Sequence, residues 1–426
     1  MSSTMRTLFA GLICLSLIPT AGAEEYFQVT TLAPGLLLIV TDQGSYSNNS
    51  LVFFGEDGLL LVDTHSSEDT EALANFVDSL GFGPPRYIIT THRHGEHIGG
   101  NGIWDSEPVI VAHHLLPDKL RSGTFLFSEY PPEIFPDITF ADSLEIGFNG
   151  EIIRLVNIGG SHDDNEIMVH FTGSGVAHIS SVVNGFNFPS VDGDGDVLMF
   201  ESVVRRLMSL LPQDVRLVSG HHGQATGYDF TGSWDQLPAY AEMMKATIEI
   251  VRRGLAAGKT TGEMQAEGVL DDYREYAGSY VGTDDWIYYI VDALTVPRED
   301  REDVCQPVFR VWKSEGARAA VDCYQRLERE QKQEYFFHET ILLSIGLKLY
   351  TRELYGDACE FLLGCTGLYP EAEYAYYSHF VLAKGFHKLE QSDKAVLHCR
   401  ESVRLNPDFS EAVEFLEELT RTPGGD

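Results

Sequence analysis

The first half of the chain alternates short apolar runs with amphipathic stretches. Apolar runs of strand length, several rich in β-branched residues and bounded by glycine, predict strands at 36–40, 50–54, 58–64, 86–91, 151–157, 166–171, 175–181 and 215–220. Between them, residues 67–80 and 199–211 carry apolar side chains at helical spacing. Strands interleaved with helices predict an α/β domain in which helices cover the sheets.

The second half has a different pattern, because strand signals end near residue 300 and the chain then reads as wholly helical. Residues 239–260 and the stretch to Leu294 predict helices that connect the two halves. Four positions recur 37 residues apart: Gly346, Leu349, Ala358 and Pro370 match Ala383, Phe386, Ala395 and Pro407. This spacing resembles tetratricopeptide repeats, whose helix pairs stack because one pair alone cannot bury its apolar face. We expect a less regular unit at 308–328 before them; the alternative is a helical bundle with chance periodicity.

The N-terminal segment has the features of an export signal. Arg6 precedes an apolar run, and small residues stand at positions 21 and 23, which predicts cleavage after Ala23. The run is short and Pro19 interrupts it, so we expect no membrane span in the mature chain; an uncleaved anchor is the alternative. The predicted organisation is a signal at 1–23, an α/β domain at 24–242, connecting helices at 243–300 and helical repeats at 301–426. The expected location is periplasmic or extracellular.

Composition narrows the choice of partners. The net charge of −34, from 30 basic and 64 acidic residues, argues against nucleic acid or an anionic membrane as a partner. A small-molecule substrate and a protein partner remain compatible with it. Apart from Cys14, five cysteines lie between Cys305 and Cys399, and they form either a Cys305–Cys323 bridge or buried free thiols.

Candidate chemistry begins at "TTHRHGEHIGGN" (90–101), which holds His92, His94 and His97. A predicted strand runs into it, so His92 and His94, two residues apart in extended chain, project to the same side. Neutral imidazole is a good ligand for zinc. A polar surface loop is the alternative; we interpret the cluster as part of a metal site.

Three more segments extend this pattern: "LLVDTHSS" (60–67), "GGSHDDNEIMVHF" (159–171) and "VSGHHG" (218–223). Their order resembles the metallo-β-lactamase superfamily, which carries an early Asp, then His-x-His-x-Asp-His, a His before a strand, an Asp or Cys, and Gly-His. The resemblance runs from Tyr26 to His222. It implies a four-layer αββα sandwich, two mixed sheets back to back with helices outside and a metal site at one edge. The fold class expected for the whole chain is therefore this α/β sandwich followed by an all-α repeat domain.

The resemblance also implies a role for each matching residue. His92, His94 and His162 would hold a first zinc ion, whereas Glu96, His97 and His221 would belong to a second, and Asp63 would support the site. The chain departs from the family twice, because Glu96 replaces an aspartate and Ser181 stands where a bridging aspartate is usual. Since a neutral hydroxyl is a poor zinc ligand, we expect one tightly bound zinc and a second that is weak or absent.

This donor set predicts hydrolysis. Three histidines leave zinc a fourth position for a water molecule with a pKa near 7, which can attack a carbonyl or ester-type bond. Glu96 would orient that water or carry its proton. The expected function is therefore an exported zinc-dependent hydrolase. The alternative is a non-catalytic or weakly active metal-binding scaffold whose repeats bind a protein or self-associate.

The substrate is less constrained. In one β-lactamase group a Cys-x-x-Lys places a lysine against the drug's carboxylate, but the matching stretch here is "SVVN" (181–184), which weakens a β-lactamase reading. The segment 118–135 either lines a substrate pocket or is an ordinary surface excursion. Its candidate pocket residues are Lys119, Arg121, Phe125, Phe127 and Tyr130.

Overall fold

The computed structural model describes residues 26–42, 47–122, 130–191, 195–221, 231–278, 281–295, 302–332, 334–337, 339–370, 372, 374–407 and 409–421. The predicted export signal at 1–23 lies outside these residues. None of the described helices is both long and apolar enough to cross a membrane.

Two sheets form the core of the first half. The first sheet has the strand order β1-β2-β3-β4-β5-β6-β7, antiparallel from β1 to β4 and parallel from β4 to β7. Its strands are β1 (Gln28–Ala33), β2 (Leu36–Asp42), β3 (Ser47–Gly55), β4 (Gly58–Val62), β5 (Pro85–Ile89), β6 (Val109–His113) and β7 (Ile138–Phe140). It is therefore a mixed sheet.

The second sheet is also mixed. Its order is β13-β12-β11-β10-β9-β8, in which only the described pair β11–β12 runs parallel. Its strands are β8 (Ser143–Phe148), β9 (Glu151–Asn157), β10 (Ile167–Phe171), β11 (Val176–His178), β12 (Arg216–Val218) and β13 (Thr231–Ser233).

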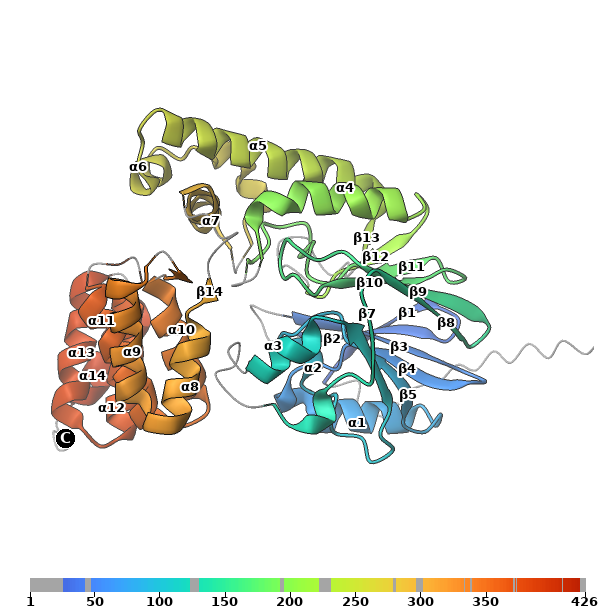
Figure 1. The fold of residues 1–426 in the computed structure, drawn as a ribbon, viewed down its shortest axis with the longest axis horizontal. Helices are drawn as coiled ribbons and strands as arrows, with labels where there is room; N and C mark the ends of the chain where they lie inside the picture. The colour runs from blue at the N-terminus through green and yellow to red at the C-terminus, as the bar shows by residue number, and fades with distance from the viewer. Residues whose placement is uncertain are drawn as a thin grey trace, which may run out of the picture.

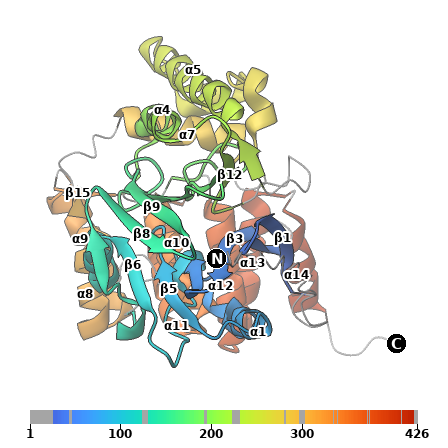
Figure 2. The ribbon, with the colours of Figure 1, turned by 90° about the vertical axis from the view of Figure 1, so that its right-hand side faces the viewer.

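The two sheets pack face to face, and helices cover both outer faces. Leu38, Leu60 and Val169 belong to the apolar layer between the sheets. On the outer face of the first sheet lies α1 (Thr70–Ser79), whose Leu73, Phe76 and Val77 are buried. Helices α4 (Phe200–Leu210), α5 (Leu237–Ala256) and α7 (Thr283–Thr295) cover the second sheet (Figures 1 and 2). This arrangement confirms the expected four-layer sandwich.

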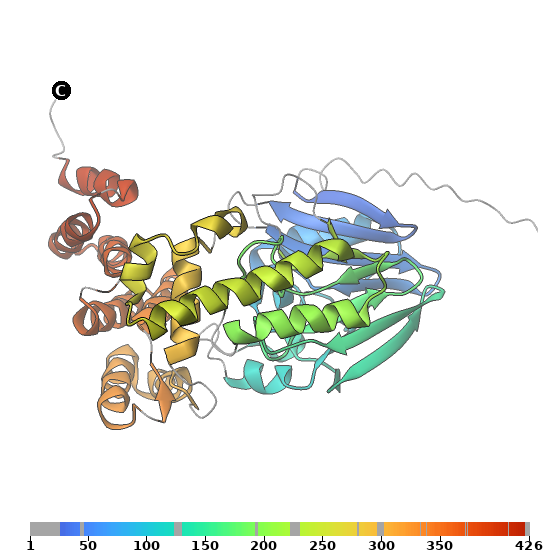
Figure 3. The same cartoon turned by 90° about the horizontal axis from the view of Figure 1, so that it is seen from above.

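The connecting region packs on the sandwich. Helix α5 runs continuously through residue 242, and its Tyr240 and Met244 share one core with Trp286 of α7. The short α6 (Thr261–Ala266) lies at the end of α5 that is nearer the C-terminal helices (Figure 3). The predicted domain boundaries remain predictions.

The C-terminal part is helical, as predicted. Its helices are α8 (Cys305–Glu315), α9 (Ala317–Glu330), α10 (Glu339–Thr351), α11 (Tyr355–Leu368), α12 (Ala375–Lys388), α13 (Ser392–Leu405) and α14 (Ser410–Thr420). A side chain at Gly346 would lie 2.6 Å from Leu362, so its absence lets α10 and α11 approach closely. The pairs α10–α11 and α12–α13 are consistent with helical repeats, and α8–α9 covers the less regular unit expected at 308–328.

Two details qualify the sequence predictions for this part. The expectation that no strand follows residue 300 was slightly wrong, because Glu302–Asp303 (β14) pairs in parallel with Tyr335–Phe336 (β15). Two-residue strands lack a sequence pattern of their own. No disulfide joins any two of the five described cysteines, so no Cys305–Cys323 bridge forms.

Candidate metal centre

The candidate ligands come from loops that meet at one edge of the sandwich. Asp63 follows β4, and the chain from Thr90 to His94 follows β5, its parallel neighbour. Helix α2 (Gly95–Ile98) then turns Glu96 and His97 back toward the same point. His162 lies between β9 and β10, and His221 follows β12 and makes a β-bridge with Asn48 of the first sheet.

The first group consists of His92, His94 and His162, all buried. One ligand nitrogen from each ring lies within 4.8 Å of the others. His162 Nε2 and His94 Nδ1 are 3.2 Å apart, and the rings of His92 and His94 have centroids 4.4 Å apart. The structure thus brings together the three histidines that the sequence assigned to the first zinc.

The second group consists of Glu96, His97 and His221, whose ligand atoms meet the same 4.8 Å limit. His97 Nε2 lies 3.2 Å from His221 Nε2, and Glu96 Oε1 lies 3.7 Å from His221 Nε2. Glu96 Oε1 is also 3.9 Å from His94 Nδ1, which belongs to the first group. The Glu96 carboxylate therefore lies where the two groups meet.

The donor geometry fits zinc. Two nitrogens bound to one tetrahedral zinc at 2.0–2.1 Å are about 3.3 Å apart, close to the spacing within each group. Burial and neighbouring histidines hold the pKa of His92 well below its usual value, and they lower the pKa of His221 to about 3. Both rings are therefore neutral at physiological pH, the form that binds metal.

The other ring nitrogens face protein groups. His97 Nδ1 lies 2.8 Å from Asp63 Oδ2, His162 Nδ1 2.8 Å from the Ser190 carbonyl oxygen, and His221 Nδ1 2.9 Å from the Ser47 carbonyl oxygen. Such contacts orient metal-binding rings and leave Nε2 for the ion. His94 has the opposite orientation, with Nδ1 inward and Nε2 3.6 Å from Asp163 Oδ2.

Asp63 fits the supporting role that the resemblance implied. Burial opposes its ionisation, but His97 outweighs this and holds the pKa of the Asp63 carboxyl below its usual value. It also accepts hydrogen bonds from the Thr91 backbone N–H and hydroxyl, at 2.8 Å each. Asp63 therefore touches a ligand of the second group without belonging to either group.

Ser181 lies beside the second group. Its hydroxyl is buried and has no hydrogen-bond partner among the described residues. A Cβ placed on Gly220 would lie 2.8 Å from Ser181 Oγ and 3.0 Å from His97 Cε1, so the hydroxyl and this ring face the same glycine. Neither group includes Ser181.

Sequence reasoning missed a charged network behind the first group. Asp163 is fully buried, with Oδ2 2.8 Å from Arg93 Nε and Oδ1 3.9 Å from Lys119 Nζ. Lys119 also pairs with Asp164 at 2.7 Å. Although burial disfavours the charge, Arg93 and His94 hold the pKa of Asp163 below its usual value. The acidic residues of "HDDNE" (162–166) were the sequence's sign of this network, but Arg93, the partner of Asp163, lies 70 positions earlier in the chain.

The five candidate pocket residues predicted in the segment 118–135 have different outcomes in the structure. Lys119 lies in this network, Arg121 pairs with Asp118 on the surface, and Phe125 and Phe127 lie outside the described residues. The Tyr130 hydroxyl is buried, and burial raises its pKa. The pocket role predicted for this segment therefore remains a prediction.

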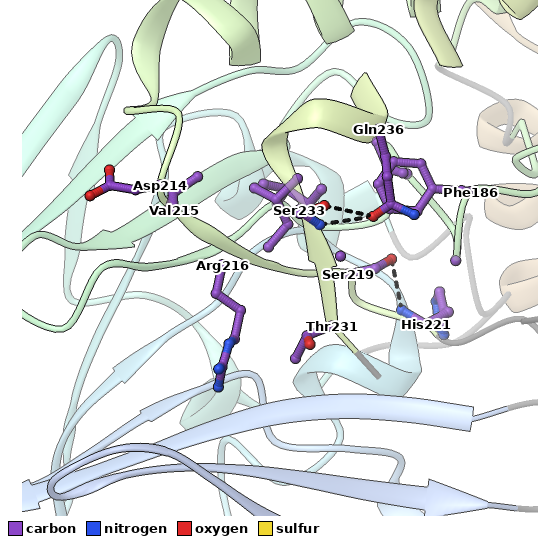
Figure 4. A pocket seen from close by; sticks show the side chains of 14 residues that line it. Phe186, Asp214, Val215, Arg216, Ser219, His221, Thr231, Ser233 and Gln236 are labelled. Carbon is purple, nitrogen blue, oxygen red and sulfur yellow. Dashed lines mark hydrogen bonds between the residues drawn. The ribbon is translucent and has the colours of Figure 1, made fainter. Parts of the chain in front are cut away.

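A cavity of about 630 Å³ has His221 of the second group in its lining (Figure 4). Apolar side chains including Ile179, Phe186 and Leu217 line it together with Arg216 and Gln236, and His221 lies at one end. The cavity reaches a candidate ligand from the side of β12 and β13. Its volume falls within the usual range for small-molecule sites.

The chain is similar to one protein family and to several solved structures. The family model described as the metallo-beta-lactamase superfamily matches residues 44–221. Among similar solved structures, a metallo-beta-lactamase from Pontibacter korlensis is 18% identical, with 51% of this chain and 99% of that chain covered and a TM-score of 0.44. The DIM-1 metallo-beta-lactamase is 17% identical, with 52% of this chain and 98% of that chain covered and a TM-score of 0.42. TMB-1 is 18% identical, with 52% of this chain and 98% of that chain covered and a TM-score of 0.42. From the family match and the fold, we conclude that the chain contains a metallo-beta-lactamase superfamily domain at residues 44–221.

Proposed function

We propose that this protein is a zinc-dependent hydrolase that cleaves a carbonyl or ester-type bond. The observation that carries the proposal is the group of His92, His94 and His162, whose inward nitrogens converge at a spacing suited to one ion. Zinc held there supplies an acidified water molecule and a Lewis acid for the substrate's oxygen. The superfamily match supports a hydrolase as the reaction class.

The three histidines and Glu96 have different roles in this proposal. The three histidines bind the ion, and the contacts of their outer nitrogens keep the rings from turning. Glu96 is the group placed to take a proton, because its carboxylate lies between the two groups and its side chain retains 22% exposure.

The experiment is metal analysis followed by activity assays on a panel of lactam, lactone, thioester and phosphoester substrates. We expect turnover of at least one substrate, its loss on chelation and its return with zinc. His162→Ala should abolish both tight zinc binding and turnover. The matched control is Arg154→Ala, which changes an exposed side chain of β9 that belongs to neither ligand group. It should change neither zinc binding nor turnover. Turnover that persists in metal-free protein would refute the proposal.

A scaffold without turnover is the second candidate, and Ser181 favours it because the residue offers no carboxylate beside the second group. The same experiment separates the two candidates. Tight zinc binding with no turnover across the panel would favour the scaffold.

We also propose that the protein is exported and that its helical repeats bind a partner protein or a second copy. Residues 1–23 support export, which N-terminal sequencing of protein recovered from periplasm and medium would test. The stacked pairs α10–α11 and α12–α13 support an interaction role.

A further inference from the structure

His92 is supported by two hydroxyl groups. Its Nδ1 atom lies 3.1 Å from Thr91 Oγ1 and 3.3 Å from Ser180 Oγ. All three residues are fully buried. Both hydroxyls therefore contact the imidazole away from bulk water. The direction of each hydrogen bond then determines which ring nitrogen carries the proton.

Each hydroxyl is also connected to a buried carboxyl group. Thr91 Oγ1 donates to Asp63 Oδ2 at 2.8 Å, and the Ser180 hydroxyl is hydrogen-bonded to Glu166. Glu166 is held in turn by the backbone N–H of Ser181, 3.1 Å from its Oε1. The pKa of Asp63 is held below its usual value, so Asp63 is ionised and takes the single proton of the Thr91 hydroxyl, which can then only accept from His92. Nδ1 of His92 must therefore carry the ring proton, and Nε2 keeps its lone pair for a metal ion.

We propose that Ser180 and Thr91 are positioning residues that fix the metal-binding tautomer of His92 and thereby set the metal affinity of the first group. The inference rests on the metal binding in the proposed function and not on hydrolysis. It assigns a role to two residues that are not ligands themselves.

The backbone at Ser180 supports this assignment. Its φ of 54° lies in the left-handed region, which favours glycine and strains a residue with a side chain. Ser180 keeps a side chain there, and that side chain provides the hydroxyl between Glu166 and His92. Ser180→Gly therefore removes the hydroxyl at a position where the backbone accepts glycine readily.

The Thr91 and Ser180 hydroxyls connect to different ligands of the site. Asp63, which accepts from Thr91, also receives His97 Nδ1 of the second group. Loss of the Thr91 hydroxyl should therefore disturb a ligand in each group, whereas loss of the Ser180 hydroxyl should disturb only the first. This difference distinguishes the two positions experimentally.

The test uses the full chain, stripped of metal and titrated with cobalt(II) against a competing chelator. Outer contacts of metal-binding histidines are typically worth 10–100-fold in affinity, so Ser180→Gly should weaken the tightest cobalt by about 10-fold and alter its visible absorption band. Thr91→Val should also weaken the tightest cobalt by about 10-fold, and Thr91→Ser, which retains the hydroxyl, should restore it. Ser181→Ala is the matched control, since its hydroxyl has no described partner, and should leave the tightest cobalt unchanged.

Melting temperatures of the metal-free variants show whether each one folds. Wild-type affinity and spectrum in a folded Ser180→Gly protein would overturn the inference while leaving the metal site intact. A Thr91→Ser protein as weak as Thr91→Val would also overturn it, because the hydroxyl would then be irrelevant. Failure of the wild-type chain to bind cobalt would instead refute the metal site of the proposed function, and this inference with it.

Discussion

The buried carboxyl of Glu166 makes the stability of the metal-free protein depend on pH in a way that one substitution should remove. Burial, and then the neighbouring charge of Asp163, raise the pKa of Glu166 from 4.5 to about 8. Between these values the folded protein holds a proton that the unfolded chain has released. The stabilising contribution is therefore complete below pH 4.5 and is lost as the pH rises through about 8.

The magnitude follows from this displacement of the pKa. A full proton of difference changes the free energy of unfolding by about 1.4 kcal/mol per pH unit, so the whole window has an upper bound on the order of 5 kcal/mol. Allowing for relaxation around the buried group, we expect about 1 kcal/mol per unit between pH 5.5 and 7.5. Glu166→Gln retains an amide oxygen for the Ser181 N–H but cannot ionise, so it lacks this slope.

The assay is urea unfolding of metal-free wild type and Glu166→Gln at half-unit steps of pH. Buried histidines such as His65 and His221, whose pKa burial lowers to about 3, add a slope of opposite sign below pH 6.5. That slope is common to both proteins and cancels in the comparison. The free energy of unfolding of Glu166→Gln should increase relative to that of wild type as the pH rises. For Glu145→Gln, at an exposed position on β8, it should keep a constant difference from wild type. Parallel curves for wild type and Glu166→Gln would refute the reasoning.

Three further predictions concern the second group and the repeats. Ser181→Asp should tighten the second zinc by about 1–3 kcal/mol, because it restores a carboxylate beside His97; calorimetric titration showing unchanged affinity would contradict this. Glu96→Gln should weaken the second zinc and spare the first if the carboxylate is a ligand, whereas a pure proton carrier would leave zinc content alone and lower turnover by about 10²–10⁴-fold. A chain ending at Leu294 should keep its zinc but change its solubility or oligomeric state, since neither ligand group found among the described residues includes a residue beyond His221. Loss of zinc from that shorter chain while it remains folded would show that the repeats complete the site.

The sequence was most informative where one loop carries several donors. His92, His94 and His97 follow the end of β5, and strand geometry alone places the first two on one side. Bringing His162 and His221 to them depends on the packing of two sheets, so the assignment of these residues came from the family resemblance. The structure then placed all six candidate ligands in the two expected groups.

The supporting residues were harder to predict. The contacts between Arg93 and Asp163, and between His92 and Ser180, join positions far apart in the chain, and neither pair forms a pattern within a single segment. Five strands of the two large sheets were missed. Both β1 and β8 carry few buried side chains, β7 and β13 have only three residues each, and β6 was missed although its side chains are mostly buried. Short edge strands depend on their neighbours more than on their own composition.

The central claim is that the group of His92, His94 and His162 holds the dominant metal ion. The most direct test is elemental analysis of the full chain purified without added metal, before and after mild chelation. We expect nearer one zinc than two per chain, and the one that remains should be lost in His162→Ala but retained in His221→Ala. Two ions that both resist chelation, or one ion that survives His162→Ala and is lost in His221→Ala, would contradict it.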